Sequence, residues 1–240
     1  MGVIVPAILP ASRQELEDKL TKLAGLADSV QIDVVDGRFA APACWPYSGG
    51  TKELALMAAR EETLPHYGEM TFDIDLMAEN PEQVVGSWVS LGASRMTIHA
   101  EATTALGKLV ADFQSRYGHE KDFIPDLISL GLAIGADTPL GLIEPFVEQI
   151  DYVQLMGIRR IGVQGQPFDG RVVQRVKELK RKHQKLAVQV DGGVSKATAP
   201  ALLSAGVDRL VIGSALWNAP NLADEIAAFN DLAQRYGTYE

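Results

Sequence analysis

The chain has 240 residues, 47% hydrophobic and 22% charged, which is ordinary globular composition, and its net charge of −9 argues against nonspecific nucleic-acid binding. Its single cysteine, Cys44, excludes an intramolecular disulfide and a cysteine-based zinc cluster. Because the N-terminus lacks signal-peptide features and no apolar run approaches the roughly 18 residues of a membrane span, we expect a cytoplasmic protein with neither a membrane nor a nucleic acid as partner.

Short β-branched segments alternate with longer amphipathic segments along the whole chain. Eight segments are predicted to be strands: Val3–Ile8, Val30–Val35, Met70–Leu76, Arg95–Ala100, Leu127–Ile134, Tyr152–Gly157, Leu186–Val190 and Arg209–Ile212. Apolar residues at helical spacing predict eight helices between and after them: Gln14–Ala27, Lys52–Glu62, Pro81–Leu91, Ala105–Tyr117, Pro139–Glu148, Arg171–His183, Ala197–Ala205 and Ala223–Tyr236. Ser12, with Glu15 three residues later, is the expected N-cap of the first helix.

The alternation of strands and helices predicts the fold. Eight repeats at this length are typical of an α/β fold in which a parallel sheet closes into a (β/α)8 TIM barrel, one domain over residues 1–240. An open doubly wound sheet is the alternative, but no Gly-x-Gly-x-x-Gly motif follows the first strand. The longest irregular stretch, Gly37–Gly50, is either a lid over a site or a surface loop.

Acidic residues end three of the predicted strands. Side chains alternate along a strand, so Gln31 and Asp33 share one face, as do Asp73 and Asp75, and Asp191 ends the seventh strand. A single acid at such a place equally suits a turn or a helix cap, but three converge on the mouth of a barrel. Opposed carboxylates, Asp33 and Asp191, suit removal of a proton beside a carbonyl and its return on the opposite face. A metal ion there would stabilise the enediolate.

Glycines follow three neighbouring strands. The loop Gly162–Gln166 follows the sixth strand, Gly192 and Gly193 end the seventh, and Gly213 and Ser214 end the eighth. Glycine lets backbone N–H groups close on an anion, and phosphate sites recur at this part of the barrel. Tight turns are the alternative interpretation. Arg159 and Arg160 lie close by in sequence and would add charge-assisted contacts unless they are simply solvated.

A series of motifs resembles one known family in order and spacing. They are Pro6-Ala7-Ile8-Leu9, Asp33-Val34-Val35-Asp36-Gly37, Asp73-Ile74-Asp75-Leu76-Met77, Ile98-His99-Ala100-Glu101-Ala102, Thr138-Pro139, Leu155-Met156, Val190-Asp191-Gly192-Gly193-Val194 and Gly213-Ser214-Ala215. Along nearly its whole length the chain resembles the ribulose-phosphate 3-epimerases. The resemblance implies a phosphorylated ketose substrate and the interconversion of ribulose 5-phosphate and xylulose 5-phosphate. It implies a homo-oligomer as well, since relatives form dimers and larger assemblies.

The resemblance also implies roles for individual residues. Asp33 and Asp191 would be the acid/base pair. The side chains of Met77 and Met156 would pack beside the enediolate, although core filling is an equal alternative. His99 would donate or accept a hydrogen bond with the substrate, or be an inward-facing histidine satisfied by its neighbours. The residues expected to bind the substrate phosphate are Gly165, Gln166, Gly192, Gly193, Gly213 and Ser214.

The expected metal site departs from the family pattern of two histidines and two aspartates. Gln31 and Asp75 stand at the histidine positions, while Asp33 and Asp191 are kept. A divalent metal (Mg, Mn, Fe or Zn) bound by Gln31, Asp33, Asp75 and Asp191 would have only oxygen ligands, a set that favours Mg²⁺ or Mn²⁺ over zinc. Alternatively, no metal binds and Gln31 donates a hydrogen bond to the substrate.

Two other functions stay open from the sequence. One is another ketose-phosphate epimerase, or a lyase that acts through an enediolate on the same barrel. Relatives of the lyase kind carry Asp-x-Lys-x-x-Asp, whereas this chain reads Asp33-Val34-Val35-Asp36 without a lysine. The other is a non-catalytic phosphosugar-binding protein, against which the retained Asp33 and Asp191 argue.

Overall fold

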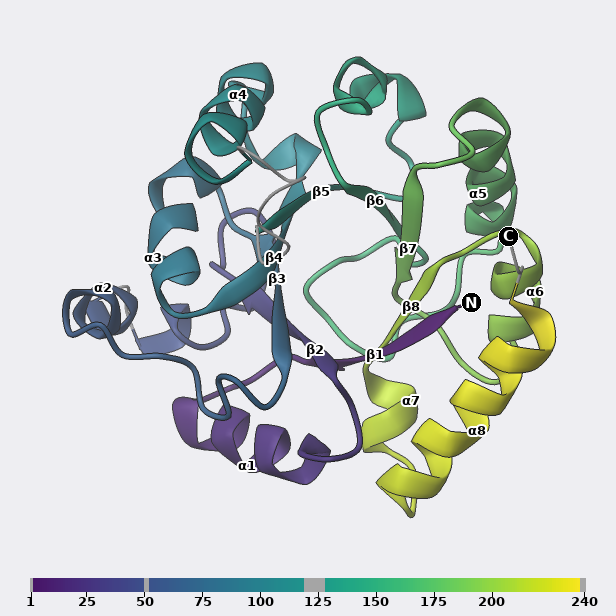
Figure 1. Cartoon of the computed structure of the whole chain (residues 1–240), viewed down its shortest axis with the longest axis horizontal. Coiled ribbons are helices and arrows are strands. Elements are labelled where there is room, and N and C mark those ends of the chain that lie inside the picture. Colours follow the sequence, from purple (N-terminus) through teal and green to yellow (C-terminus); the bar gives the residue numbers. More distant parts are fainter. Residues whose placement is uncertain (1, 50–51, 119–127, 238–240) are drawn as a thin grey trace.

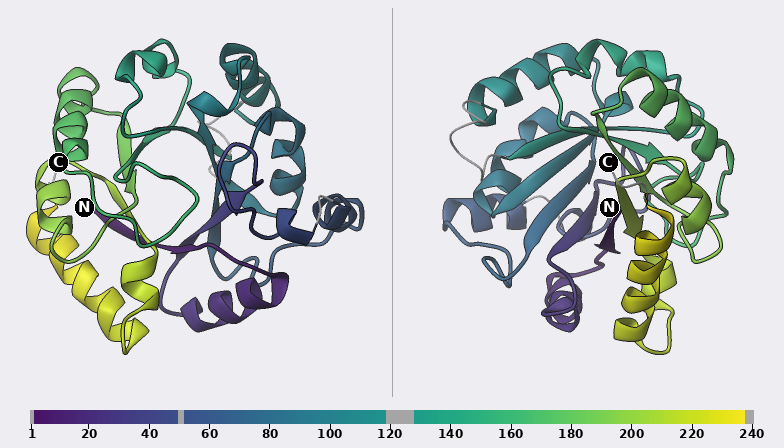
Figure 2. Two further views of the ribbon diagram at one scale, coloured as in Figure 1. Left: turned by 180° about the vertical axis from the view of Figure 1, so that it is seen from behind. Right: turned by 45° about the vertical axis from the view of Figure 1, so that its right-hand side comes forward.

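The computed structural model describes residues 2–49, 52–118 and 128–237. Eight parallel strands close into a barrel in the order β1 to β8, and helices surround it (Figure 1). The predicted (β/α)8 TIM barrel is thereby confirmed. The two ends of the described chain lie close together (Figure 2), since a β-carbon at residue 237 would be 3.1 Å from the Gly2 nitrogen. None of the helices in the described ranges has the length and apolar character to cross a membrane.

The strands lie within two residues of their predicted bounds over the described chain. They are β1 Val3–Ile8, β2 Ser29–Val35, β3 Thr71–Met77, β4 Ala93–His99, β5 Ser129–Ile134, β6 Tyr152–Met156, β7 Ala187–Asp191 and β8 Arg209–Ile212. Leu127, where the fifth strand was expected to begin, lies outside the described residues. Each strand pairs in parallel with its neighbours, so all carboxyl ends meet at one mouth.

Most predicted helices form. They are α1 Arg13–Leu23, α2 Lys52–Ala59, α3 Val85–Ser90, α4 Leu106–Tyr117, α5 Arg171–Lys182, α6 Ala199–Ser204 and α8 Leu222–Tyr236, with an unpredicted short helix α7 Ser214–Trp217. Ser12 caps α1 as expected, since its hydroxyl accepts a hydrogen bond from the Glu15 N–H at 3.2 Å.

One predicted helix is wrong. Residues 139–148 form only two 3₁₀ turns, η4 Leu140–Leu142 and η5 Glu144–Phe146. Gly141 weakens a helix through its backbone entropy, and Pro145 lacks the N–H that an interior turn needs. Similarly, the helix expected from Pro81 to Leu91 begins as a 3₁₀ turn, η2 Pro81–Gln83, before α3.

The barrel separates an apolar outer layer from a polar interior. Branched side chains on the outer strand faces pack against the helices in one continuous core. Inside the barrel, Val5, Ala7 and Val211 form a small apolar cluster on the β1–β8 side. Many of the other inward positions hold buried polar side chains: Gln31, Asp33, Asp73, Asp75, Thr97, His99, Gln154 and Gln189. Buried polar groups need partners, so this interior has to be a connected network.

The amino-terminal end of the interior is an ion-pair layer. Asp73 lies 2.6 Å from Arg209 Nη2 and 3.2 Å from Arg95 Nε. The Arg95 guanidinium stacks over the Tyr152 ring at 3.9 Å, and Gly131 leaves room for that ring, because a β-carbon at residue 131 would collide with it. The two cations therefore balance the buried carboxylate below the acids at the mouth.

The loop after β2 is packed against the barrel over its described part, 37–49. Ala40 and Cys44 are buried against Val35 and Met77 at the ends of β2 and β3. The Trp45 ring meets Trp88 edge-on at 6.1 Å. The described part of the loop is therefore anchored to the barrel at these residues, and none of it lines the cavity at the mouth.

Candidate active site

Three strands bring three aspartates to one point at the mouth. Asp33 and Asp75 are register partners at the ends of β2 and β3, and Asp191 is the last residue of β7. One carboxylate oxygen from each of the three lies within 4.8 Å of those from the other two. Asp33 and Asp75 are buried, while Asp191 is partly exposed. The convergence expected from strand alternation is therefore present in the structure.

Gln31 lies directly beneath this group and presents its nitrogen to it. Its Nε2 donates to Asp33 Oδ1 at 2.8 Å and to Asp191 Oδ2 at 3.0 Å. Its oxygen points away, toward Gln189. An amide nitrogen has no lone pair to offer a cation. This arrangement therefore argues against Gln31 as a metal ligand.

The environment makes both acids of the predicted pair hard to ionise. Burial raises the pKa of Asp33 well above its ordinary value, and the charges of Asp191 and Asp75 add to the effect. Burial, followed by the charge of Asp75, raises the pKa of Asp191 to about 7. Close carboxylates of this kind hold a proton between them near neutral pH, so a base and an acid are available together.

His99 is buried behind the acids. Its Nε2 lies 3.2 Å from Asp75 Oδ1, and its ring packs against Phe39 at 5.3 Å. Burial lowers the pKa of His99, but the charge and contact of Asp75 outweigh this and leave it raised. Since His99 does not line the cavity at the mouth, direct contact with a substrate is not what its position supports.

A cavity opens above the acids, and most of the predicted site residues line it. Gln31, Asp75 and His99 lie outside this lining. The predicted residues that do line it are Asp33, Met77, Met156, Gly165, Gln166, Asp191, Gly192, Gly193, Gly213 and Ser214. The acid pair and the glycine turns thus face one space.

The Gly192-Gly193 turn has no room for side chains. Both residues have positive φ, 95° and 69°, a region that other residues enter only with strain. A β-carbon at Gly192 would lie 2.6 Å from Ile158, and one at Gly193 would lie 2.8 Å from the Phe168 Cα. Bare backbone therefore faces the cavity here, as an anion site requires.

Gln164 is a cavity residue that sequence reasoning treated only as part of a loop. It lines the cavity, and a hydrogen bond from its side-chain amide to Asp33 opposes the rise in the pKa of that carboxyl. The amide nitrogen lies next to Gly213, where a β-carbon would be 2.6 Å from it. An amide nitrogen carries two protons, so it can donate to Asp33 and to a ligand in the cavity. A long amide side chain in a glycine-rich loop was the signal available in the sequence.

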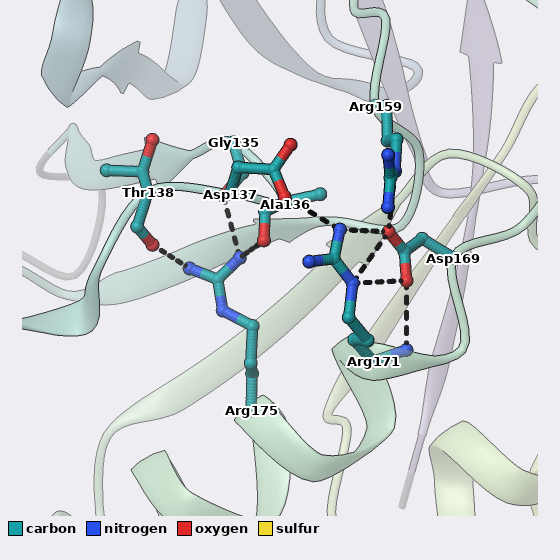
Figure 3. A network of polar contacts seen from close by, with 8 residues as sticks. All are labelled: Gly135, Ala136, Asp137, Thr138, Arg159, Asp169, Arg171 and Arg175. Atoms are coloured by element: carbon teal, nitrogen blue, oxygen red, sulfur yellow. Dashed lines mark hydrogen bonds and ion pairs between the residues drawn. The ribbon is translucent and has the colours of Figure 1, made fainter.

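The arginines near the sixth strand serve a different network. Arg159 Nε lies 3.4 Å from Asp169 and is mostly exposed. Asp169 also holds Arg171 at the start of α5, and Arg175 donates to the carbonyls of Gly135, Ala136 and Thr138 at 2.6–2.8 Å (Figure 3). Neither Arg159 nor Arg160 lines the cavity above the acids, and both line a neighbouring hollow together with Gln166.

The three aspartates fit a hard divalent cation. Each offers one oxygen to a common point, and Asp75 Oδ1 also lies 3.2 Å from His99 Nε2. Carboxylate oxygens are the ligands that Mg²⁺ and Mn²⁺ prefer. The ligand set that the structure supports is thus Asp33, Asp75 and Asp191.

The family is shown by sequence. Residues 3–217 match the family model described as the ribulose-phosphate 3 epimerase family. The chain belongs to this family. A member from Bacillus subtilis (strain 168), named ribulose-phosphate 3-epimerase, is 30% identical over 89% of this chain and 91% of its own length. A member from Schizosaccharomyces pombe with the same name is 29% identical over 95% and 92%.

Solved structures outside the ribulose-phosphate 3-epimerases share the barrel. KGPDC from Streptococcus mutans superposes with a TM-score of 0.69 at 15% identity over 98% of each chain. The 3-hexulose-6-phosphate synthase from Salmonella typhimurium gives 0.68 at 13% identity over 98% and 99%. At this identity the likeness concerns the fold alone.

Proposed function

We propose that this chain is a sugar-phosphate 3-epimerase that interconverts ribulose 5-phosphate and xylulose 5-phosphate. The observation that carries the proposal is the shared cavity: two aspartates with raised pKa values and a turn of bare glycine backbone face the same space. Members of the ribulose-phosphate 3-epimerase family with the corresponding name support the choice of reaction.

The reaction needs one ionised and one protonated carboxyl group. One aspartate removes the proton from C3, and the electron pair of the C–H bond forms a C2–C3 double bond as the carbonyl becomes an enediolate. The other aspartate delivers its proton to the opposite face of C3 while the double bond returns to the carbonyl. Asp33 and Asp191 exchange their protonation states in each turnover. No net proton is gained or lost.

The other lining residues would bind and orient the substrate. The Gly192-Gly193 turn, with Gly165, Gln166, Gly213 and Ser214, would hold the phosphate through backbone and hydroxyl donors. Met77 and Met156 would cover the enediolate without offering it a proton. The Nε2 of Gln164 would donate to an oxygen of the substrate. A cation held by Asp33, Asp75 and Asp191 would supply charge stabilisation for the enediolate oxygens.

The cavity offers less support to a lyase with a lysine at its centre. Among the described residues, no lysine lines it. A non-catalytic phosphosugar-binding protein would need the glycine turns but not a pair of acids with raised pKa values. As further proposals, we retain a homo-oligomer, which size-exclusion chromatography with light scattering would test, and a cytoplasmic location.

Isotope exchange tests the reaction directly. Ribulose 5-phosphate incubated with the protein in deuterated water should gain deuterium at C3 and yield xylulose 5-phosphate. Asp33→Asn and Asp191→Asn should each abolish both signals while the circular dichroism spectrum stays unchanged. Asp231→Asn, at an exposed position on α8, is the matched control and should exchange normally. Binding of the sugar phosphate without exchange would instead identify a non-catalytic binding protein.

A further inference from the structure

We propose that Arg209, at the amino-terminal end of the barrel, sets the direction of three buried glutamine amides and through them holds all three aspartates at the mouth. Its effect on the reaction rests on the proposed function, whereas the hydrogen-bond pattern stands on its own. The positioning residues are Arg209, Gln189, Gln31 and Gln154, and the three glutamines are fully buried.

The direction begins at Arg209. Its Nε donates to Gln189 Oε1 at 3.0 Å. A guanidinium can only donate and does not lose its proton in proteins. The side-chain oxygen of Gln189 must therefore face Arg209, and its nitrogen must face the other way.

From Gln189 the pattern divides into two arms. Its Nε2 donates to Gln31 Oε1 at 3.0 Å and to Gln154 Oε1 at 2.7 Å. Both protons of that nitrogen are used. Since each of the two accepting amides turns its oxygen toward Gln189, each must turn its nitrogen toward the mouth.

The arms end on the proposed site. Gln31 Nε2 donates to Asp33 and Asp191, and Gln154 Nε2 donates to Asp75 Oδ2 at 2.9 Å and contacts the Met156 sulfur at 3.5 Å. All six amide protons of the three glutamines thus have acceptors. If Gln31 or Gln154 were reversed, its side-chain oxygen would face a carboxylate and its N–H groups would face those of Gln189. If Gln189 were reversed, its N–H groups would face the N–H of Arg209.

Because the direction of the Gln31 amide is fixed, it can hold two carboxylates in a constant position relative to each other. One Gln31 nitrogen lies within 3.0 Å of an oxygen of Asp33 and of Asp191, so it bridges them from below. Such support fixes a proton-transferring group in place more tightly than packing alone.

Two substitutions at residue 189 separate direction from packing. Gln189→Glu keeps the shape and an acceptor for Arg209 but has no proton to donate, so Gln31 and Gln154 should turn their nitrogens toward it and away from the aspartates. Gln189→Met removes every hydrogen bond without attracting those nitrogens. We expect Gln189→Glu to be the more stable of the two in urea and yet to have the lower kcat, at least about tenfold below wild type, with KM changed less than about twofold.

A purely structural role predicts the opposite order for activity, because the more stable variant would then be the more active one. That result would overturn the proposal. Gln184→Glu, at an exposed position, is the control for the added charge and should match wild type in both measurements.

A second readout does not depend on the reaction. In ¹H–¹⁵N spectra, the side-chain NH₂ signals of Gln31 and Gln154, assigned by their loss in Gln31→Leu and Gln154→Leu, should exchange slowly with water in the wild type and shift in Gln189→Glu. Unchanged signals in Gln189→Glu would overturn the proposal even if the enzyme is active. Shifted signals in a protein that shows no C3 exchange would leave the proposed amide pattern intact and remove only the proposed function.

Discussion

The Cα of Gly213 faces the side-chain amide of Gln164 so closely that a β-carbon at residue 213 would lie 2.6 Å from Gln164 Nε2. The glycine at the end of β8 and the amide in the loop after β6 therefore share one space at the cavity. Because the obstacle is the far end of a flexible side chain, an added methyl group would move Gln164 rather than the backbone.

Gly213→Ala should consequently raise KM for ribulose 5-phosphate by about tenfold, the equivalent of roughly 1.4 kcal/mol, with little change in melting temperature. The physical reason is displacement of the Gln164 donor from the substrate. In a double-mutant cycle, Gly213→Ala should add little to Gln164→Ala, since the residue that the methyl group displaces is already gone. Full additivity of the two effects would show that the methyl group acts on something else.

Gly193→Ala should weaken both the fold and substrate binding, because its β-carbon would meet the Phe168 backbone at 2.8 Å with φ at 69°. The matched control is Gly25→Ala, where φ is 74° and nothing lies within 4 Å of the added carbon. The control should cost roughly 1 kcal/mol of stability through its backbone conformation alone, with KM unchanged. Urea unfolding and steady-state kinetics of both variants check this, and equal losses in the two would contradict a tight turn at residue 193.

Mn²⁺ should bind the wild-type protein, and Asp75→Asn should weaken that binding by at least about tenfold, since Asp75 supplies one of three converging oxygens. Asp231→Asn serves as the control. Electron paramagnetic resonance of free Mn²⁺ measures the affinity without reference to activity. Equal Mn²⁺ affinities for wild type and Asp75→Asn would show that the cation binds elsewhere on the protein. Because all three ligand atoms are oxygens, Mg²⁺ should compete with Mn²⁺ for this site more effectively than it would for a site of thiolate or imidazole ligands.

Cys44 should resist thiol reagents in the folded protein. Burial raises its pKa to about 12, so at pH 8 the thiolate is roughly a thousandfold rarer than in the unfolded chain. Because the pKa is higher in the folded state, the unfolded chain ionises first, and stability should fall as pH rises above about 8.5. Modification rates with and without urea measure the first effect. In Cys44→Ala, the free energy of unfolding should fall less steeply at alkaline pH, because this thiol no longer contributes to the fall. An unchanged fall would show that other groups cause it.

The convergence of Asp33, Asp75 and Asp191 could be predicted from sequence because it follows from two simple rules. Side chains alternate along each strand, and parallel strands in a closed barrel end at the same mouth. The same rules located the Gly192-Gly193 turn. Neither requires knowledge of how a side chain is rotated.

The direction of the Gln31 amide could not be predicted in the same way. It depends on Gln189, which is 158 residues away in sequence, and on Arg209 beyond that. Gln154 and Gln189 each stand in a short, mostly apolar strand, so nothing local distinguishes a network member from an isolated polar residue. The segment 139–148 is the opposite case, because Gly141 and Pro145 lie within the predicted helix itself and oppose it despite the helical spacing of its apolar residues.

Arg209 also bears on the order in which the molecule is made. It lies on β8, the last strand to leave the ribosome, yet it donates to Ser29 on β2 at 2.9 Å and to Asp73 on β3 at 2.6 Å. A nascent chain that ends before residue 209 lacks this cation at the amino-terminal end of its interior, so the buried Asp73 carboxylate has only Arg95 as a cationic partner. We therefore expect the barrel to remain incompletely folded until β8 has been synthesised, and then to fold in one cooperative step.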